Sequence, residues 1–295
     1  MRHERFVPTV AILLAMALWG SSFVVMKMAF SDLHPFFVIF GRLTIASLCF
    51  LPFLRRYGSS LQRRHLLPLT CMALFEPCLY FLFEVSALVN TSASQASMIT
   101  TMLPLMVACT AALILKERLT GKTVVGFLLA AVGALWLTLA GYSTEQAPRP
   151  VLGNFFEFMA MLCATGYIIL AKVLTRELSP VFVTGVQSIV GALFFLPLLF
   201  FPRLHVPHEF SATGLWIIVY LGCFVSAGAY GMYNYGVSRV PASQASAFIN
   251  LIPVFGVGLG FCVLGERLTF QQTLACVVVF LGVLISQDYR ARQTR

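Results

Sequence analysis

Charged side chains are scarce in this sequence. They make up only 11% of its 295 residues, with 11 acidic and 20 basic residues, whereas ordinary soluble domains contain about 25%. Hydrophobic residues account for 59% of the chain and the mean hydropathy is +0.88. This balance excludes an ordinary soluble domain and predicts a chain that folds within lipid.

The eight cysteines also lack the spacings of a metal site. All lie in apolar runs and none forms a CxxC pair, so they indicate neither a metal centre nor a disulfide framework. No nucleophile–base or metal-ligand spacing of the kind an intramembrane enzyme needs is present either. We therefore expect a non-enzymatic protein with no cofactor and no bound metal.

Long apolar runs are abundant instead. A membrane-spanning helix needs about 20 mostly apolar residues, and the first run is too long, and followed by too many others, for a signal peptide. The sequence predicts an all-α integral membrane protein with ten transmembrane helices. The runs lie at 7–29, 35–54, 66–88, 92–115, 120–141, 151–173, 180–201, 211–236, 241–264 and 268–287.

The chain is also internally repeated. The motif Ala-Ser-Gln-Ala-Ser occurs at 93–97 and again at 242–246, and Glu-Arg-Leu-Thr occurs at 117–120 and 266–269. Each copy holds five runs, and an odd number of crossings forces the two copies into opposite orientations. We expect two inverted five-helix domains, 7–141 and 151–287, with the substrate site at their interface. The polar segment 141–150 would link them.

Membrane topology, and not nucleic-acid binding, explains the net charge of +9. With a cytoplasmic N-terminus, 15 of the 20 lysines and arginines fall on the inside, as the positive-inside rule requires. Both termini are then cytoplasmic. No basic patch with interleaved stacking aromatics remains to bind nucleic acid.

Specific motifs resemble a known family. The Leu-Trp-Gly-Ser-Ser-Phe segment at 18–23 is similar to the opening motif of EamA-type carriers of the drug/metabolite transporter superfamily. So are the paired Ala-Ser-x-Ala-Ser motifs, each followed by a proline and then Glu-Arg-Leu-Thr. The resemblance implies ten helices, a central cavity and alternating access in a bacterial cytoplasmic (inner) membrane. Such carriers export amino acids, other metabolites or toxic compounds.

Ionisable residues within a span are functional candidates because they are costly in lipid. Glu76 and Glu84 in the third run lie about 80° apart around the helix and about 12 Å apart along it, with Tyr80 between them. Glu84 is interpreted as a proton carrier or a partner for a cationic group, or as a structural partner of Arg42. Glu76 either serves the kink at Pro77 or lies near the cytoplasmic mouth.

The remaining substrate candidates are one arginine and several aromatic or amide side chains. Arg42 could clamp a substrate carboxylate, pair with Glu84, or extend towards the membrane interface. Trp19 could stack on substrate or simply pack. Hydroxyls and an amide in the second half could orient a zwitterion. These are Tyr167, Tyr230, Tyr233 and Asn234.

Gates and hinges are predicted at paired positions of the two copies. Gln95 and Gln244 begin the fourth and ninth runs, where capping is favoured over gating. The two Glu-Arg-Leu-Thr motifs are interpreted as turn chemistry, with Thr120 and Thr269 capping the next helices. Pro104 and Pro253 would bend the fourth and ninth helices and shape the cavity, with hinge action as an additional hypothesis.

These features predict a secondary transporter that exports amino acids or similar small polar metabolites. Arg42 would bind the carboxylate, Glu84 the amine or a proton, and proton antiport would drive export. Two alternatives stay open, a multidrug carrier for lipophilic cations and an uncoupled facilitator. Since each chain already holds both orientations, we expect a functional monomer.

Overall fold

The described protein is entirely helical. A computed structural model describes residues 2–114, 120–145, 147–200 and 211–286, and these contain no β-strand beyond one isolated bridge between Thr144 and Ala147. The all-α prediction is therefore confirmed for this part of the chain.

The helical elements follow one another with short connections. In chain order they are α1 (Arg2–Asp32), α2 (Pro35–Tyr57), η1 (Gly58–Ser60), α3 (Arg63–Ala73), η2 (Leu74–Leu79), α4 (Tyr80–Asn90), α5 (Ala93–Ile99), η3 (Thr100–Met102), α6 (Leu103–Ile114), α7 (Gly121–Leu139), α8 (Pro150–Leu174), α9 (Pro180–Phe195), η4 (Pro197–Phe200), α10 (Ala212–Tyr220), η5 (Leu221–Ala229), α11 (Tyr230–Arg239), α12 (Ala242–Ala247), η6 (Phe248–Leu251), α13 (Ile252–Leu264) and α14 (Phe270–Ser286).

Every predicted apolar run is helical over most of its described residues. Among those residues, eight helical segments are long and apolar enough to cross a membrane, and two shorter apolar helices lie at Val124–Leu139 and Phe270–Gly282. The chain is therefore a multi-pass membrane protein.

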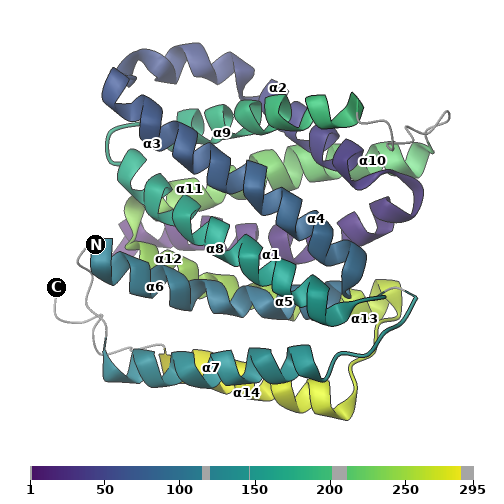
Figure 1. Cartoon of the computed structure of the whole chain (residues 1–295). Coiled ribbons are helices and arrows are strands. Elements are labelled where there is room, and N and C mark those ends of the chain that lie inside the picture. The colour runs from purple at the N-terminus through teal and green to yellow at the C-terminus, as the bar shows by residue number, and fades with distance from the viewer. Residues whose placement is uncertain (1, 115–119, 146, 201–210, 287–295) are drawn as a thin grey trace.

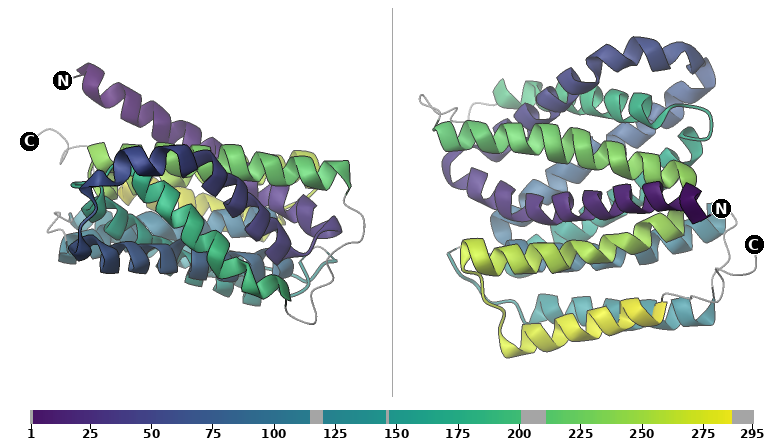
Figure 2. Two further views of the ribbon diagram at one scale, coloured as in Figure 1. Left: turned by 90° about the horizontal axis from the view of Figure 1, so that it is seen from above. Right: turned by 180° about the vertical axis from the view of Figure 1, so that it is seen from behind.

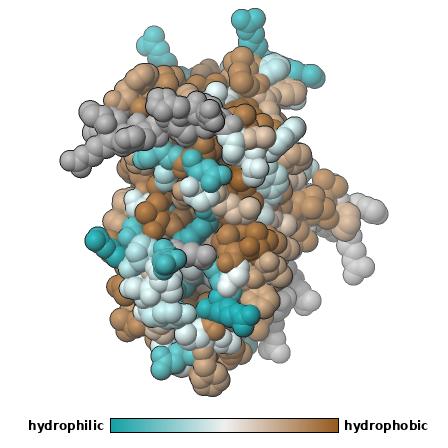
Figure 3. Space-filling view, turned by 90° about the vertical axis from the view of Figure 1, so that its right-hand side faces the viewer, coloured by the Kyte–Doolittle hydropathy of each residue, from teal (hydrophilic) through white to brown (hydrophobic). Residues whose placement is uncertain are grey.

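The helices lie side by side in one bundle (Figure 1). We call the end where α1 begins and α14 ends the termini end, and the opposite end, where α8 and α14 begin, the far end. Helices α7 and α14 pack on each other and form a separate pair at one edge of the bundle (Figures 1 and 2). Figure 3 looks onto the far end, where hydrophilic residues cover the centre between hydrophobic flanks.

Several helices are interrupted close to the middle of the bundle. The third segment breaks at Glu76, whose φ of −147° and ψ of 117° are not helical, immediately before Pro77. Proline has no N–H to donate to the preceding turn, so a helix bends or breaks there. Short 3₁₀ turns, η3 and η6, lie directly before α6 and α13, which have Pro104 and Pro253 as their second residues. The backbone around the centre of the protein is therefore not regular α-helix.

Small residues let the central helices cross closely. A Cβ atom on Gly20 of α1 would lie 2.5 Å from the Phe255 Cβ of α13, and one on Gly256 would lie 2.4 Å from the Ser97 Cβ of α5. Small side chains at such crossings allow the backbones to approach and the helices to pack tightly. The crossing holds Trp19, the neighbour of Gly20, at the centre of the bundle.

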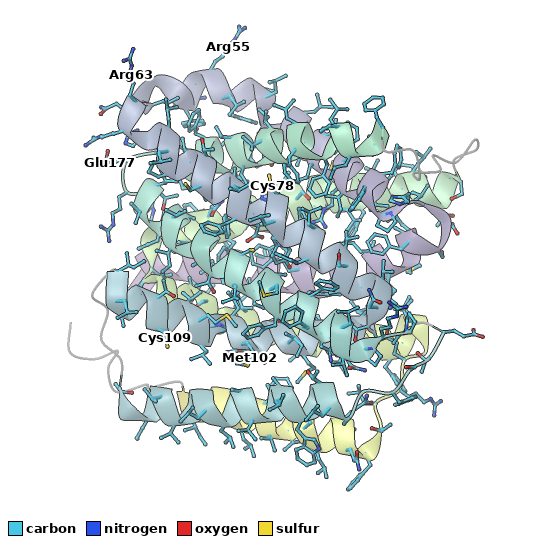
Figure 4. The ribbon with its side chains drawn as sticks, viewed as in Figure 1. Arg55, Arg63, Cys78, Met102, Cys109 and Glu177 are labelled. Carbon is cyan, nitrogen blue, oxygen red and sulfur yellow. The ribbon has the colours of Figure 1, made fainter. Side chains whose placement is uncertain are left out.

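At the termini end a polar cluster links α3 to the α8–α9 connection. Arg64 of α3 donates a hydrogen bond to Glu177 at 2.6 Å, and His65 forms one with the same carboxylate at 2.9 Å. The hydrogen bond to His65 and the charge of Arg64 lower the pKa of Glu177. Figure 4 shows Arg63 and Glu177 near one another at this end.

Thr269 caps α14, as predicted. Its hydroxyl accepts a hydrogen bond from the Gln272 N–H at 3.2 Å, while the Gln272 side chain accepts one from the Thr269 N–H at 2.8 Å. We expect Thr269→Ala to lower the free energy of unfolding by about 1 kcal/mol, because a helix N-terminus loses its side-chain acceptor. Denaturant titration in detergent would measure this. Thr273→Ala, an exposed change within the same helix, is the control and should have little effect; equal losses in both variants would contradict the capping role.

Candidate central cavity

Seven of the nine substrate candidates from the sequence line one central cavity. It lies among α1, α2, α4, α8, α11 and the interrupted segments. Its polar and aromatic lining consists of Trp19, Ser22, Phe23, Arg42, Glu76, Tyr80, Phe81, Glu84, Thr100, Tyr167 and Tyr230.

Arg42 is the one cation lining this cavity. Its side chain is only 2% exposed, so it does not extend to the membrane interface. Its Nε donates to Ser226 Oγ at 2.7 Å, and its guanidinium carbon lies 4.8 Å from the centre of the Phe81 ring. Within the described chain no carboxylate lies within 4.0 Å of it, so the Arg42–Glu84 ion pair, one of the alternatives from the sequence, is not formed. The Ser226 hydroxyl and the face of the Phe81 ring stabilise the buried charge.

Two carboxyl groups face the same space. Tyr230 donates to Glu76 Oε1 at 2.5 Å, and Tyr80 donates to Glu84 Oε1 at 2.8 Å. The second oxygen of each carboxyl is buried and has no hydrogen-bond partner in the described protein. Glu76, Tyr80 and Glu84 all line the cavity, so Glu76 lies with Glu84 and not at the termini end. Each carboxyl retains one oxygen for a ligand.

Aromatic rings form a further part of the cavity wall. The Trp19 ring centre lies 5.0 Å from that of Tyr230 and 4.9 Å from that of Tyr233. Tyr167 lies 6.1 Å from Tyr230 in an edge-to-face arrangement. Such rings present apolar faces and can also attract a cation. The Trp19 Nε1 donor is buried and has no acceptor in the described residues.

Two predicted candidates support the wall without lining the cavity. Asn234 accepts from Tyr167 at 2.7 Å and donates to Thr184 at 2.8 Å. Tyr233 is fully buried behind Trp19. Neither residue is part of the cavity lining. Asn234 therefore orients Tyr167, and Tyr233 packs against Trp19. Their contact with substrate stays a prediction.

The sequence analysis missed a third buried carboxyl. Glu157 of α8 is 0% exposed, and neither of its carboxyl oxygens has a hydrogen-bond partner in the described protein. It is an ionisable residue inside the predicted run 151–173, which was signal enough to select it. Glu157 does not line the cavity, but Met161 and Ala164, one and two turns along α8, do.

Gln95 does not cap its helix, contrary to the favoured interpretation. The N-cap of α5 is Ser92, whose hydroxyl accepts from the Gln95 N–H at 3.1 Å. The Gln95 side chain instead accepts a hydrogen bond from Asn154 of α8 at 2.9 Å, and Asn154 accepts one from Thr91 at 2.8 Å. The side chain of Gln244 lies outside the described residues.

Glu266 contacts the other half of the chain, which turn chemistry alone does not explain. Its two carboxyl oxygens accept hydrogen bonds from the N–H groups of Ala93 and Ser94, both at 2.8 Å. A carboxylate is well placed at these first amides of α5, because they have no partner within the helix. The corresponding Glu117 and Arg118 lie outside the described residues.

Two lysines make equivalent contacts at opposite ends of the bundle. Lys27 of α1 donates to the carbonyl oxygens of Leu88, at 2.9 Å, and of Thr91. Lys172 of α8 donates to the carbonyl oxygens of Val237 and Val240, at 2.8 and 2.6 Å. In the internal repeat Leu88 corresponds to Val237 and Thr91 to Val240, as Lys27 corresponds to Lys172. Each lysine thus binds the carbonyl end of one helix, α4 or α11.

Comparisons with known proteins agree with this architecture. A model described as the EamA-like transporter family matches residues 8–139 and, a second time, residues 151–286. The uncharacterized transporter YcxC of Bacillus subtilis is 26% identical, over all of this chain and 97% of its own length. The uncharacterized transporter YetK of the same organism is 25% identical, over 94% and 86%. A crystal structure described only as that of a protein has a similar fold, with a TM-score of 0.72, 19% identity and coverage of 99% and 100%.

Proposed function

Because the chain belongs to the EamA-like transporter family, we propose that it exports amino acids or similar small polar metabolites across the bacterial cytoplasmic membrane. Transport would occur by alternating access between the two repeats, and both termini would lie in the cytoplasm. The observation that carries this proposal is the lining of the cavity, where Arg42 and the carboxyls of Glu76 and Glu84 face one space.

Each part of a zwitterion has a matching group in this cavity. Arg42 has donors beyond the Nε bound to Ser226, and a guanidinium can bind a carboxylate through two parallel hydrogen bonds. The unpartnered oxygens of Glu76 and Glu84 suit an ammonium group, and the ring faces of Trp19 and Tyr230 suit an apolar side chain.

Counterflow in liposomes tests the proposal directly. Purified protein would be loaded with unlabelled amino acids, and the uptake of a labelled amino acid would be followed without any energy source. We expect saturable exchange that selected amino acids inhibit. No exchange with any amino acid would contradict this substrate class.

Proton coupling is tested by an imposed pH gradient. We expect the gradient to accelerate transport, and Glu84→Gln to remove that response while exchange continues, because an amide cannot release a proton. Asp32→Asn, an exposed change at the far end, is the control. A pH response that survives in Glu84→Gln would remove Glu84 from the coupling mechanism, and no response in the unmodified protein would favour a facilitator.

The aromatic wall favours a second candidate, a multidrug carrier for lipophilic cations. Trp19, Tyr80, Phe81, Tyr167 and Tyr230 line the cavity together with two carboxyls, a combination that attracts cations. Competition separates the two functions. Inhibition of amino-acid exchange by a lipophilic cation without its own transport would favour the metabolite carrier, and accumulation of the cation would favour the multidrug carrier.

A further inference from the structure

Glu157 is the most isolated buried carboxyl in the described protein. Its side chain has no exposed surface and neither oxygen has a hydrogen-bond partner there. An ionised carboxylate in such a place is very costly, because it has lost its water and gained nothing in return. The group must therefore hold a proton whenever no cation approaches it.

The charged surroundings of Glu157 do not supply that cation. Helix α4, packed along α8, brings Glu84 and Tyr80, and Glu84 is close enough to interact electrostatically with Glu157. The segment η2 brings Glu76, and α11 brings Tyr230 and Tyr233. Two neighbouring carboxyls that cannot both ionise share protons as one unit.

The cations on the surrounding helices lie away from Glu157. Those on α3, α7 and α11, namely Arg63, Arg64, Lys122 and Arg239, belong to the termini end of the bundle. Arg149, directly before α8, is exposed and about 12 Å along the helix from Glu157. The remaining titratable groups of the packed elements are His65 on α3, Tyr235 on α11, and cysteines on α3, η2 and α6 (Cys71, Cys78 and Cys109). The described residues of α5 and α12 contain none.

Polar side chains lie between this carboxyl and the far end, although none of them hydrogen-bonds to Glu157. Asn154 lies three residues before Glu157, on the same face of α8. Asn154 donates to Gln95 at 2.9 Å. Gln95 in turn lines a hollow at the far end, together with Glu145 and Glu266. Glu84, which interacts electrostatically with Glu157, lines the central cavity.

We propose that Glu157 is a proton-binding site, which takes protons from water admitted at the far end past Gln95 and Asn154 and exchanges them with Glu84 in the cavity. A proton from that water joins one carboxylate oxygen of Glu157 and later leaves it for Glu84, so no reactant other than water is needed. With cytoplasmic termini the far end faces outward, so the route would admit protons from outside. This inference adds a second protonation site to the proposed coupling.

Infrared difference spectroscopy tests the proposal without any transport substrate. Full-length protein in lipid vesicles would be titrated with pH while the C=O stretching bands of protonated carboxyls are followed. We expect the unmodified protein to lose such a band as the pH rises, and Glu157→Gln to lack one component of it. Asp32→Asn, which removes an exposed carboxyl at the end of α1, should keep the Glu157 component.

Further variants separate proton binding from misfolding and test the route. Glu157→Asp retains a carboxyl and should retain a shifted band. Asn154→Leu should slow the exchange of the Glu157 proton after transfer to deuterium oxide. A Glu157 band that persists unchanged throughout the titration, or an unchanged spectrum in Glu157→Gln, would overturn the proposal. Because no cargo is present, failure of amino-acid counterflow leaves this result interpretable, and the two proposals fail separately.

Discussion

Replacing Arg42 with methionine is expected to abolish amino-acid counterflow while leaving the protein as stable as before. The side chain keeps a similar length but loses the guanidinium that would bind the substrate carboxylate. A hydrogen bond to a charged group contributes about 1.5–3 kcal/mol, which corresponds to binding that is weaker by roughly 10- to 150-fold. Substrate exchange should therefore fall below detection at concentrations that saturate the unmodified carrier.

Stability should stay unchanged although transport is lost. Arg42 is 2% exposed and has no carboxylate within 4.0 Å in the described chain, so methionine removes a buried charge without breaking an ion pair. Replacing buried charges by apolar groups of similar volume is often neutral or stabilising. The Ser226 hydroxyl would lose one donor, which is a smaller effect.

Two companion variants make the Arg42 result specific. Arg42→Lys keeps the charge but loses the planar pair of donors, so it should retain weak exchange. Arg239→Met removes an exposed arginine that also lies over an aromatic ring, Tyr235 at 5.2 Å, and should transport normally. Normal counterflow in Arg42→Met would exclude Arg42 from substrate binding. A large loss of stability would instead indicate that Arg42 holds α1, α2 and η5 together.

Apolar run length predicted most of the fold but only part of the site. The runs located the helices because spanning segments must be long and apolar, and Glu76, Tyr80 and Glu84 share the cavity as their helical spacing indicated. The partners of Gln95 and Glu266 could not be predicted, because Asn154 and Ala93 reach them from elements distant in the sequence. Such contacts depend on how the helices pack and leave no periodic signal.

Missing Glu157 had a different cause. In the third run two acidic residues and a tyrosine form a stripe at helical spacing. Glu157, in contrast, is isolated among aromatic and small residues. A lone acid has no spacing pattern to interpret. Its complete burial and its lack of partners are properties of the folded protein, and only these distinguish it from an acid that faces a cavity.

Removing Lys27 or Lys172 should destabilise the protein by a similar amount at either end. Each lysine is the donor for two carbonyl oxygens, those of Leu88 and Thr91 or of Val237 and Val240. A buried acceptor that loses its donor costs about 1–3 kcal/mol. We expect Lys27→Met and Lys172→Met each to lower the free energy of unfolding by about that much, measured by denaturant titration in detergent.

The double variant gives the stronger test of the predicted repeat. Lys27 lies at the far end and Lys172 at the termini end, so the two sites share no partner and their losses should add. Lys122→Met, which removes an exposed lysine from α7, should leave stability unchanged. If one lysine proved dispensable and the other essential, the two contacts would be equivalent in geometry but not in energy. Equal and additive losses would mean that a lysine stabilises the carbonyl end of one interrupted helix in each repeat, once at each end of the bundle.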